Sequence, residues 1–166
     1  MKKGVKHNLR YLVIILISIL LLAFVDFIVL EKIYNPISAE FNIPWDSFTA
    51  VLFGIKLPMQ WWHVAFFPLA FVLFILLGFA AKSWRLAISG IILFVTGLED
   101  VFYYLIQLKF LPPTLDWLDP TIIGLTRFIT RTPHVISLGV LISLTIGILA
   151  SLIILFSYNP LKLIKK

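Results

Sequence analysis

The chain has 166 residues, of which 61% are hydrophobic and only 13% are charged, with a formal net charge of +6 and no cysteine. Soluble domains are usually about 25% charged, so residues 1–166 are predicted to form a single domain of an all-α integral membrane protein in the cell membrane. The lack of cysteine excludes disulfides and thiolate chemistry. The basic residues cluster at the ends of apolar runs, which indicates membrane orientation and no nucleic-acid binding.

Four apolar runs approach or exceed the roughly 20 residues that a helix needs to cross a bilayer. They predict a bundle of four transmembrane helices at about residues 11–30, 64–81, 86–108 and 135–158. Helices are expected because backbone exposed to lipid must satisfy its own hydrogen bonds. The first run starts like a signal peptide, but no small-residue cleavage site follows it, so it is predicted to be retained.

The distribution of basic residues predicts the orientation of these helices. The two terminal segments and the link between the second and third runs contain basic residues and no acidic ones, and four spans place all three on one side. The positive-inside rule then predicts that both termini are cytoplasmic. The basic residues concerned are Lys2, Lys3, Lys6, Arg10, Lys82, Arg85, Lys162, Lys165 and Lys166.

Each of the two long outer loops contains an apolar segment that is too short to span. One opens at Pro44-Trp45-Asp46 and runs through Ile55, and the other opens at Asp119-Pro120 and runs through Ile129. An Asp at the N-cap, and Pro at the first helical position, are signals for a helix start. Two short interfacial helices are therefore predicted, with ordinary apolar loops as the alternative. Tryptophans would anchor them at headgroup level, namely Trp45, Trp61, Trp62 and Trp117.

The order of landmarks in the chain repeats. In the first half Asp26, Trp45 and His63 follow one another, and in the second half Asp100, Trp117 and His134 do so, at steps of 17 to 19 residues. This pattern indicates a tandem two-span repeat with halves 9–82 and 84–158, related by an axis along the membrane normal. A chance match in an apolar chain is the alternative.

Glu99 and Asp100 are the most unusual residues, because they interrupt the third apolar run. An ionised carboxylate at the centre of a membrane helix costs roughly 2.5–3.5 kcal/mol on insertion scales. Such residues face the bundle interior and mark a functional site. The predicted catalytic residues are Glu99 and Asp100, as general acid or base, and Tyr103 one turn later. Tyr103 or Tyr104 would orient a substrate headgroup.

A metal site is a further hypothesis. If the helices form a bundle, two imidazoles and several carboxylates converge in its outer half, and this donor set suits zinc, manganese or iron. The predicted ligands are Asp26, His63, Glu99, Asp100 and His134. The alternatives are interfacial histidines without a ligand and an ion pair of the buried acids with Arg127 or Arg131.

The function predicted from these residues is that of an intramembrane enzyme, a hydrolase or isomerase, which acts on a lipid-like substrate near the extracytoplasmic face. Three alternatives remain open: a cation transporter or sensor, a haem protein with His63 and His134 as axial ligands, and a non-catalytic subunit of a membrane complex. Membrane lipids are the expected partners. A ridge of small residues in the fourth run predicts either internal packing or a homo- or hetero-oligomer, and consists of Gly139, Ser143, Gly147 and Ser151.

Overall fold

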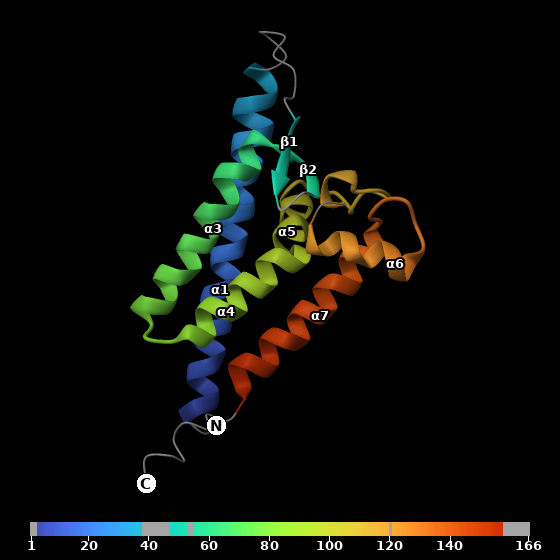
Figure 1. Ribbon diagram of the computed structural model, residues 1–166. Helices are drawn as coiled ribbons and strands as arrows, with labels where there is room; N and C mark the ends of the chain where they lie inside the picture. The colour runs from blue at the N-terminus through green and yellow to red at the C-terminus, as the bar shows by residue number, and fades with distance from the viewer. Residues whose placement is uncertain (1–2, 38–46, 53–54, 120, 158–166) are drawn as a thin grey trace.

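The structure, a computed structural model, describes residues 3–37, 47–52, 55–119 and 121–157, with the side chains of 7–37, 66–119 and 121–157. Long helices dominate it (Figure 1). The helical elements of the bundle are α1 (Lys3–Phe27) with its π-helical continuation η1 (Ile28–Tyr34), α3 (Trp61–Ala80), α4 (Trp84–Leu93), the π-helical turn η2 (Phe94–Leu98), α5 (Glu99–Ile106) and α7 (Ser137–Phe156).

Three helical stretches of the described chain are long and apolar enough to cross a membrane, at His7–Ile37, Trp84–Ile106 and Ser137–Phe156. They correspond to three of the four predicted spans. The remaining predicted span coincides with α3, whose part with described side chains is a shorter apolar helix, Phe66–Ala80. The chain is thus a predominantly helical protein of the membrane type.

The bundle has two distinct ends (Figure 1). At one end, here called the terminal end, the start of α1 meets the turn between α3 and α4, where the Tyr11 hydroxyl donates a hydrogen bond to the Ala81 carbonyl at 3.3 Å. The end of α7 joins them, because the Arg85 guanidinium donates to the Ser157 carbonyl at 2.9 Å. The opposite end is called the distal end, and it carries the acidic residues described below.

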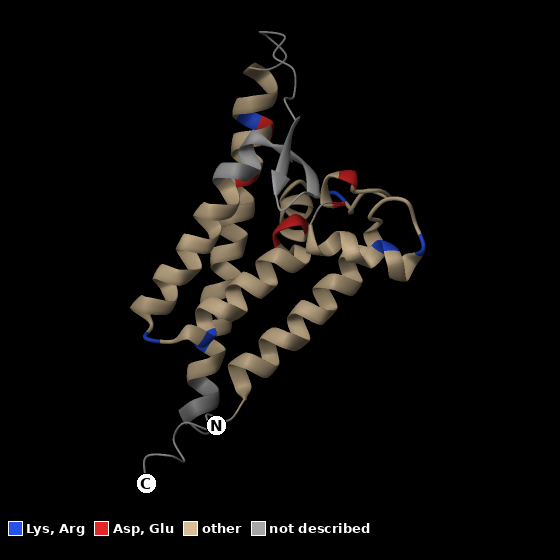
Figure 2. Ribbon diagram, viewed as in Figure 1, with Lys and Arg blue, Asp and Glu red and all other residues tan. Residues whose placement is uncertain are grey.

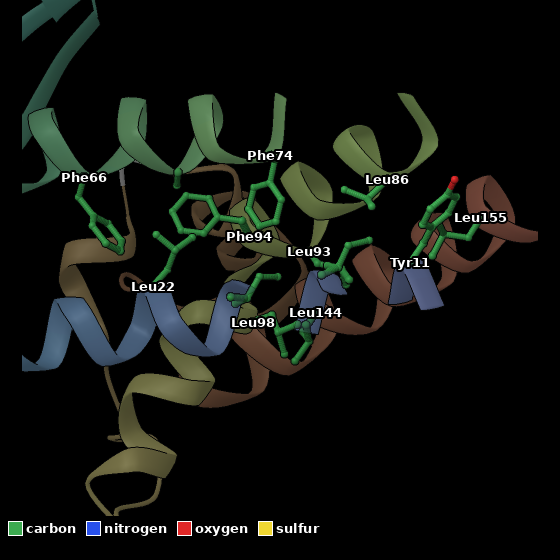
Figure 3. Close-up of a cluster of buried hydrophobic side chains, with 13 residues drawn as sticks. Tyr11, Leu22, Phe66, Phe74, Leu86, Leu93, Phe94, Leu98, Leu144 and Leu155 are labelled. Atoms are coloured by element: carbon green, nitrogen blue, oxygen red, sulfur yellow. The ribbon is translucent and has the colours of Figure 1, made fainter. Parts of the chain in front are cut away.

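One cluster of buried apolar residues joins all four long helical stretches, and Phe94 lies at its centre (Figure 3). The Phe94 ring contacts four phenylalanines of α3 with ring centroids 5.8–6.5 Å apart, namely Phe66, Phe67, Phe71 and Phe74. Edge-to-face and tilted aromatic pairs of this kind add to the packing energy beyond the area that they bury.

The small-residue ridge of α7 packs inside the chain. Gly139, Ser143, Gly147 and Ser151 are all buried. A Cβ atom on Gly147 would collide with the Thr96 side chain, and one on Gly139 would collide with Thr126. Of the two roles predicted for the ridge, internal packing is the one that the fold uses.

Residues 107–136 form a compact cap over the distal end, which we call the distal cap. Its short elements are η3 (Asp116–Leu118), η4 (Ile122–Leu125) and α6 (Thr126–Thr130). The cap is closed at its base, because the Leu115 amide donates to the Val135 carbonyl at 2.8 Å and Ser137 donates to the Pro112 carbonyl at 2.6 Å.

A helical segment is present in this cap where the second interfacial helix was predicted, as η4 and α6, but the expected N-cap is wrong. Thr121, and not Asp119, caps it, since the Thr121 hydroxyl accepts from the Ile123 amide at 3.2 Å. The Asp119 carboxylate is already bonded elsewhere, as shown below. Four large apolar side chains of this segment are exposed, Ile122, Leu125, Phe128 and Ile129, as expected of an interfacial segment.

The first predicted interfacial helix is not found. Its place is taken by an antiparallel hairpin of β1 (Ser47–Leu52) and β2 (Ile55–Gln60), with Ser47 opposite Gln60. The β-branched and aromatic residues of this segment favour a strand, and a short apolar run does not distinguish strand from helix. The proposed start at Trp45 and Asp46 lies outside the described residues. The two loops differ in secondary structure, and the tandem repeat stays a prediction.

Candidate functional site

Gly97 interrupts the helix that carries the buried acids. It lies in the π-helical turn η2 with φ of +99°, a backbone conformation that favours glycine over residues with a Cβ atom. A side chain there would also press on Ile123 at 3.1 Å and Val140 at 3.2 Å. The helix restarts immediately afterwards as α5, with Glu99 and Asp100 in its first turn. The kink therefore sets the direction of both carboxylates.

Three carboxylates interact at the contact between α1 and α5, and we call Asp26, Glu99 and Asp100 the acidic cluster. Asp26 and Glu99 are each only 8% exposed, and Asp26 acts electrostatically on both Glu99 and Asp100. The acidic residues at the start of α5 lie toward the distal end, within helices that are otherwise almost free of charge (Figure 2). The fold thus gathers negative charge in an apolar bundle.

The Oε1 atom of Glu99 is the most informative atom of this cluster. It is buried, and no described residue forms a hydrogen bond with it. Buried polar atoms almost always have a partner, because an unsatisfied one costs about 1–3 kcal/mol or more if it is charged. An unpaired carboxylate oxygen in this position is expected where a ligand or proton is held.

A second layer of polar contacts borders the acidic cluster. The Tyr103 hydroxyl donates to Glu31 Oε1 at 3.0 Å, and the Asn35 amide donates to the other oxygen of the same carboxylate at 3.1 Å. Glu31 lies in η1, so the contact joins the continuation of α1 to α5. Tyr103 is thereby held at a fixed orientation one turn beyond Glu99.

Four aromatic rings run beside the carboxylates from α1 across α5 to η3, and we call them the aromatic row. The ring of Phe27 is 6.3 Å from Tyr103, Tyr103 is 5.4 Å from Tyr104, and Tyr104 is 6.5 Å from Trp117. The Trp117 side chain also acts on the Asp100 carboxylate as a nearby donor group. The distal cap therefore contributes directly to the site.

The terminal half of the bundle contrasts with this site. There Ser89 of α4 and Ser151 of α7 are fully or almost fully buried and bond to each other's backbone, the Ser89 hydroxyl to the Ser151 carbonyl and the Ser151 hydroxyl to the Ser89 carbonyl. The hydrogen-bonding groups are used within the helix pair. Among the described residues, the unpartnered buried carboxylate oxygen therefore lies in the distal half, whereas these serines of the terminal half are already bonded.

His134 does not join the acidic cluster. Its Nδ1 atom lies 2.9 Å from Asp119 Oδ2 and 3.9 Å from Asp116 Oδ1 in the distal cap. The hydrogen bond with Asp119, followed by the charge of Asp116, raises the pKa of the His134 imidazole above its ordinary value. Asp119 also accepts from the Val135 amide at 2.8 Å and lies 3.5 Å from Arg127. The possible pairing of Arg127 with Glu99 or Asp100 is thus replaced by its pairing with Asp119.

The geometry gives no support to the predicted metal site of five ligands. Within the described part of the chain, no three His, Asp or Glu side chains are grouped in a way that could hold a metal ion. Asp26, Glu99 and Asp100 come together and His134 is bound in the cap. His63 is the third residue of α3, and its side chain lies outside the described residues.

Several residues of the site were not among those predicted for it, namely Phe27, Glu31, Asn35 and Trp117. Glu31 and Asn35 follow the first apolar run and look like ordinary residues at a membrane boundary. Only the π-helical continuation of α1 brings Glu31 to Tyr103. Trp117 was predicted only as an anchor at headgroup level.

Comparison of the chain with protein-family models, with curated proteins and with solved structures finds no match. The chemistry of the site is therefore what indicates its function. That chemistry is a buried carboxyl group with a neighbouring acid, a held phenol and aromatic surface, which together suit proton transfer to or from a bound molecule.

Proposed function

We propose that the chain is a four-span membrane protein with both termini in the cytoplasm. Three long apolar helices and the 20-residue α3 support this topology. The meeting of the start of α1, the α3–α4 turn and the end of α7 at one end supports it further, because Lys82 and Arg85 lie there and fit the cytoplasmic side. The distal end is then extracytoplasmic.

A chain without cysteine allows a direct test of this topology. Lys82→Cys and Lys109→Cys each introduce one thiol at an exposed position at opposite ends of the bundle. In intact cells a membrane-impermeant maleimide should label Lys109→Cys, whereas Lys82→Cys should be labelled only after permeabilisation. Equal labelling of both before permeabilisation would disprove the arrangement.

The function proposed for the site is that of an intramembrane enzyme which acts on a lipid-like substrate by general acid–base catalysis at Glu99 and Asp100. The observation that carries this proposal is the buried Oε1 atom of Glu99, which has no hydrogen-bond partner in the described part of the chain. Asp100 and Asp26 repel its charge. A carboxyl group in such surroundings is suited to take up a proton from a substrate and to return it.

Tyr103 has a positioning role in this proposal. Its hydroxyl is held by Glu31 at 3.0 Å, one helical turn from Glu99. A phenol fixed in this way can present its ring and its oxygen to a headgroup in a constant orientation. A positioned acid–base group contributes typically 10²–10⁴-fold to a rate, so a shift of the substrate by even a small distance would be costly.

A lipid-like substrate is proposed because the surroundings of the site are apolar. Trp117 is 40% exposed beside Asp100, and the distal cap presents Leu125, Phe128 and Ile129 to the outside. A molecule that approaches the acids from the membrane would meet these surfaces first. Transport of a cation is disfavoured, since Ser89 and Ser151 bond to each other in the terminal half and a pathway would need free polar groups there.

The test compares the lipid composition of host membranes that contain the wild-type protein, Glu99→Gln, Asp100→Asn or the control Asp116→Asn. Asp116 is an acid of the distal cap whose side chain is 64% exposed, so it matches the charge change without touching the site. A lipid species should be lost or formed with the wild type and the control only. Identical lipid profiles in all four membranes would reject the enzyme proposal and favour the role of a non-catalytic subunit.

A further inference from the structure

Three carboxylates of the site have no positively charged partner within the described chain. Glu31, Glu99 and Asp100 form no ion pair there with a lysine, arginine or histidine, since the described ion pairs all lie in the distal cap at Asp116 and Asp119. Asp26 adds a further carboxylate that acts on Glu99 and Asp100. Buried charges are normally paired, so the site favours a ligand that brings positive charge.

The form of the site distinguishes between kinds of cation. A metal ion needs several donor atoms packed closely around one point, and the described residues contain no such group of three. The carboxylates instead lie along α1 and its continuation from Asp26 to Glu31, over more than one helical turn, and at the start of α5 at Glu99 and Asp100. A larger and softer cation suits that spread.

The aromatic row supplies what an organic ammonium group needs. Rings of Tyr and Trp attract such a group through their negative faces at distances within about 6 Å of the ring centre. Phe27, Tyr103, Tyr104 and Trp117 lie in sequence beside the acids with ring centroids 5.4–6.5 Å apart. The row already attracts one cation, because the Lys32 amine lies 5.6 Å from the centroid of Phe27.

We infer that the acidic cluster and the aromatic row together bind the ammonium group of an amphiphilic amine, with the unpartnered Oε1 atom of Glu99 facing that group. The inference rests on the proposed function and names its substrate class, a lipid-like molecule with a positively charged nitrogen. Glu99 and Asp100 supply opposite charge, while Tyr103, Tyr104 and Trp117 supply aromatic surface. The apolar chain of the amphiphile remains in the membrane alongside the distal cap.

Binding of two amphiphiles with the same chain tests this inference. Dodecyltrimethylammonium and dodecanol are titrated into the purified full-length protein in a non-ionic maltoside detergent, and tryptophan fluorescence and Tm are recorded. The ammonium compound should change the fluorescence and raise Tm, and dodecanol should do neither. The fluorescence change should disappear in Trp117→Phe, since Trp117 is the tryptophan of the aromatic row.

The carboxylates are tested with the same probes. Glu99→Gln and Asp100→Asn should each weaken binding of dodecyltrimethylammonium by about tenfold or more, the loss that corresponds to about 1.4 kcal/mol, whereas Asp116→Asn should leave it unchanged. Where a carboxylate variant loses helical content by circular dichroism, Tyr104→Leu replaces it. That variant removes a ring of the row and should weaken binding of the ammonium compound selectively.

Three results would overturn the inference. Equal binding of dodecanol would show that only the alkyl chain of the amphiphile is recognised. Unchanged binding of the ammonium compound in the Glu99, Asp100 and Tyr104 variants would show that it does not bind at this site. Saturable binding of Zn²⁺, Mn²⁺ or Mg²⁺ that needs Glu99, with no binding of the ammonium compound, would assign the site to a metal. If the ammonium compound fails to bind but Glu99→Gln abolishes conversion of a neutral lipid, the proposed enzyme stands and only its substrate class is wrong.

Discussion

Ser89 and Ser151 exchange hydrogen bonds between α4 and α7, each hydroxyl donating to the backbone carbonyl of the other residue, at 3.4 Å and 3.2 Å. This contact brings two helix backbones together through small side chains, which is how membrane helices commonly pack. It uses the hydroxyl groups of both serines within the terminal half of the bundle. The acidic cluster lies in the opposite half.

Enlarging Ser151 should separate these helices. Ser151→Leu is expected to lower the free energy of unfolding by about 1–3 kcal/mol, because extra atoms in a packed core force neighbours aside, whereas Ser151→Ala loses one hydrogen bond and should cost about 0.6 kcal/mol. Thermal unfolding in detergent, followed by circular dichroism, measures both. The control is Ser157→Ala at the exposed end of α7. A Tm of Ser151→Leu equal to that of the control would contradict the packing.

Gly97 should tolerate no side chain. Gly97→Ala places a Cβ atom at φ of +99° and against Ile123 and Val140, so it should cost about 1–2 kcal/mol of stability. It should also turn Glu99 and Asp100 away from α1, and abolish lipid conversion. Leu105→Ala, on the exposed side of the same helix, serves as the control. Full activity in Gly97→Ala would mean that the kink does not position the acids.

The hydrogen bond between Tyr103 and Glu31 should affect substrate position more than stability. Tyr103→Phe removes a hydroxyl and is expected to cost about 1 kcal/mol in unfolding free energy, while raising KM for the converted lipid. Tyr104→Phe is the matched control, because Tyr104 contributes its ring to contacts with Tyr103 and Trp117. Glu31→Gln should reproduce the effect of Tyr103→Phe. Equal KM values for all three variants would exclude the positioning role.

The pair of Asp119 and His134 should make the stability of the distal cap depend on pH. The folded state favours the protonated imidazole, so the pKa of His134 is raised above the value of about 6.5 for an unfolded chain. The stabilisation of the folded state by this pair is therefore complete below the pKa of His134 in the unfolded chain, and it is lost as the pH rises through the pKa of His134 in the folded protein. The difference in Tm between wild type and His134→Gln should shrink over this range. The same difference measured on an Asp119→Asn background should vary less with pH, because only the effect of Asp116 remains there, and an undiminished pH dependence would contradict the assignment.

The helical spans could be predicted from the sequence, because an apolar segment in a bilayer has to form a helix. An apolar run such as residues 135–158 has no alternative to a helix in lipid, and the structure places α7 there at Ser137–Phe156. The burial of Glu99 was accessible for the same reason, since a carboxylate in lipid is costly. These predictions needed no knowledge of which helices touch.

The contacts between helices could not be predicted from the apolar runs. His134 and Glu99 both lie in the distal half of the bundle, and the prediction that they meet was based only on their similar depth in the membrane. Only the fold of the cap shows that His134 binds Asp119. The hairpin at Ser47–Gln60 was missed because a short apolar run suits either a strand or a helix. Glu31 was missed because the register of the π-helical η1 has no signature in the residues that form it.

The break at Gly97 has a consequence for how such a site is inherited. The backbone there has φ of +99° between two helical segments, a conformation that glycine adopts without the steric cost of a Cβ atom. A single nucleotide change in the codon for Gly97 would therefore be enough to redirect the later side chains of α5. The glycine and the carboxylates after it are expected to be inherited as one unit, because the acids lose their position when the glycine is replaced.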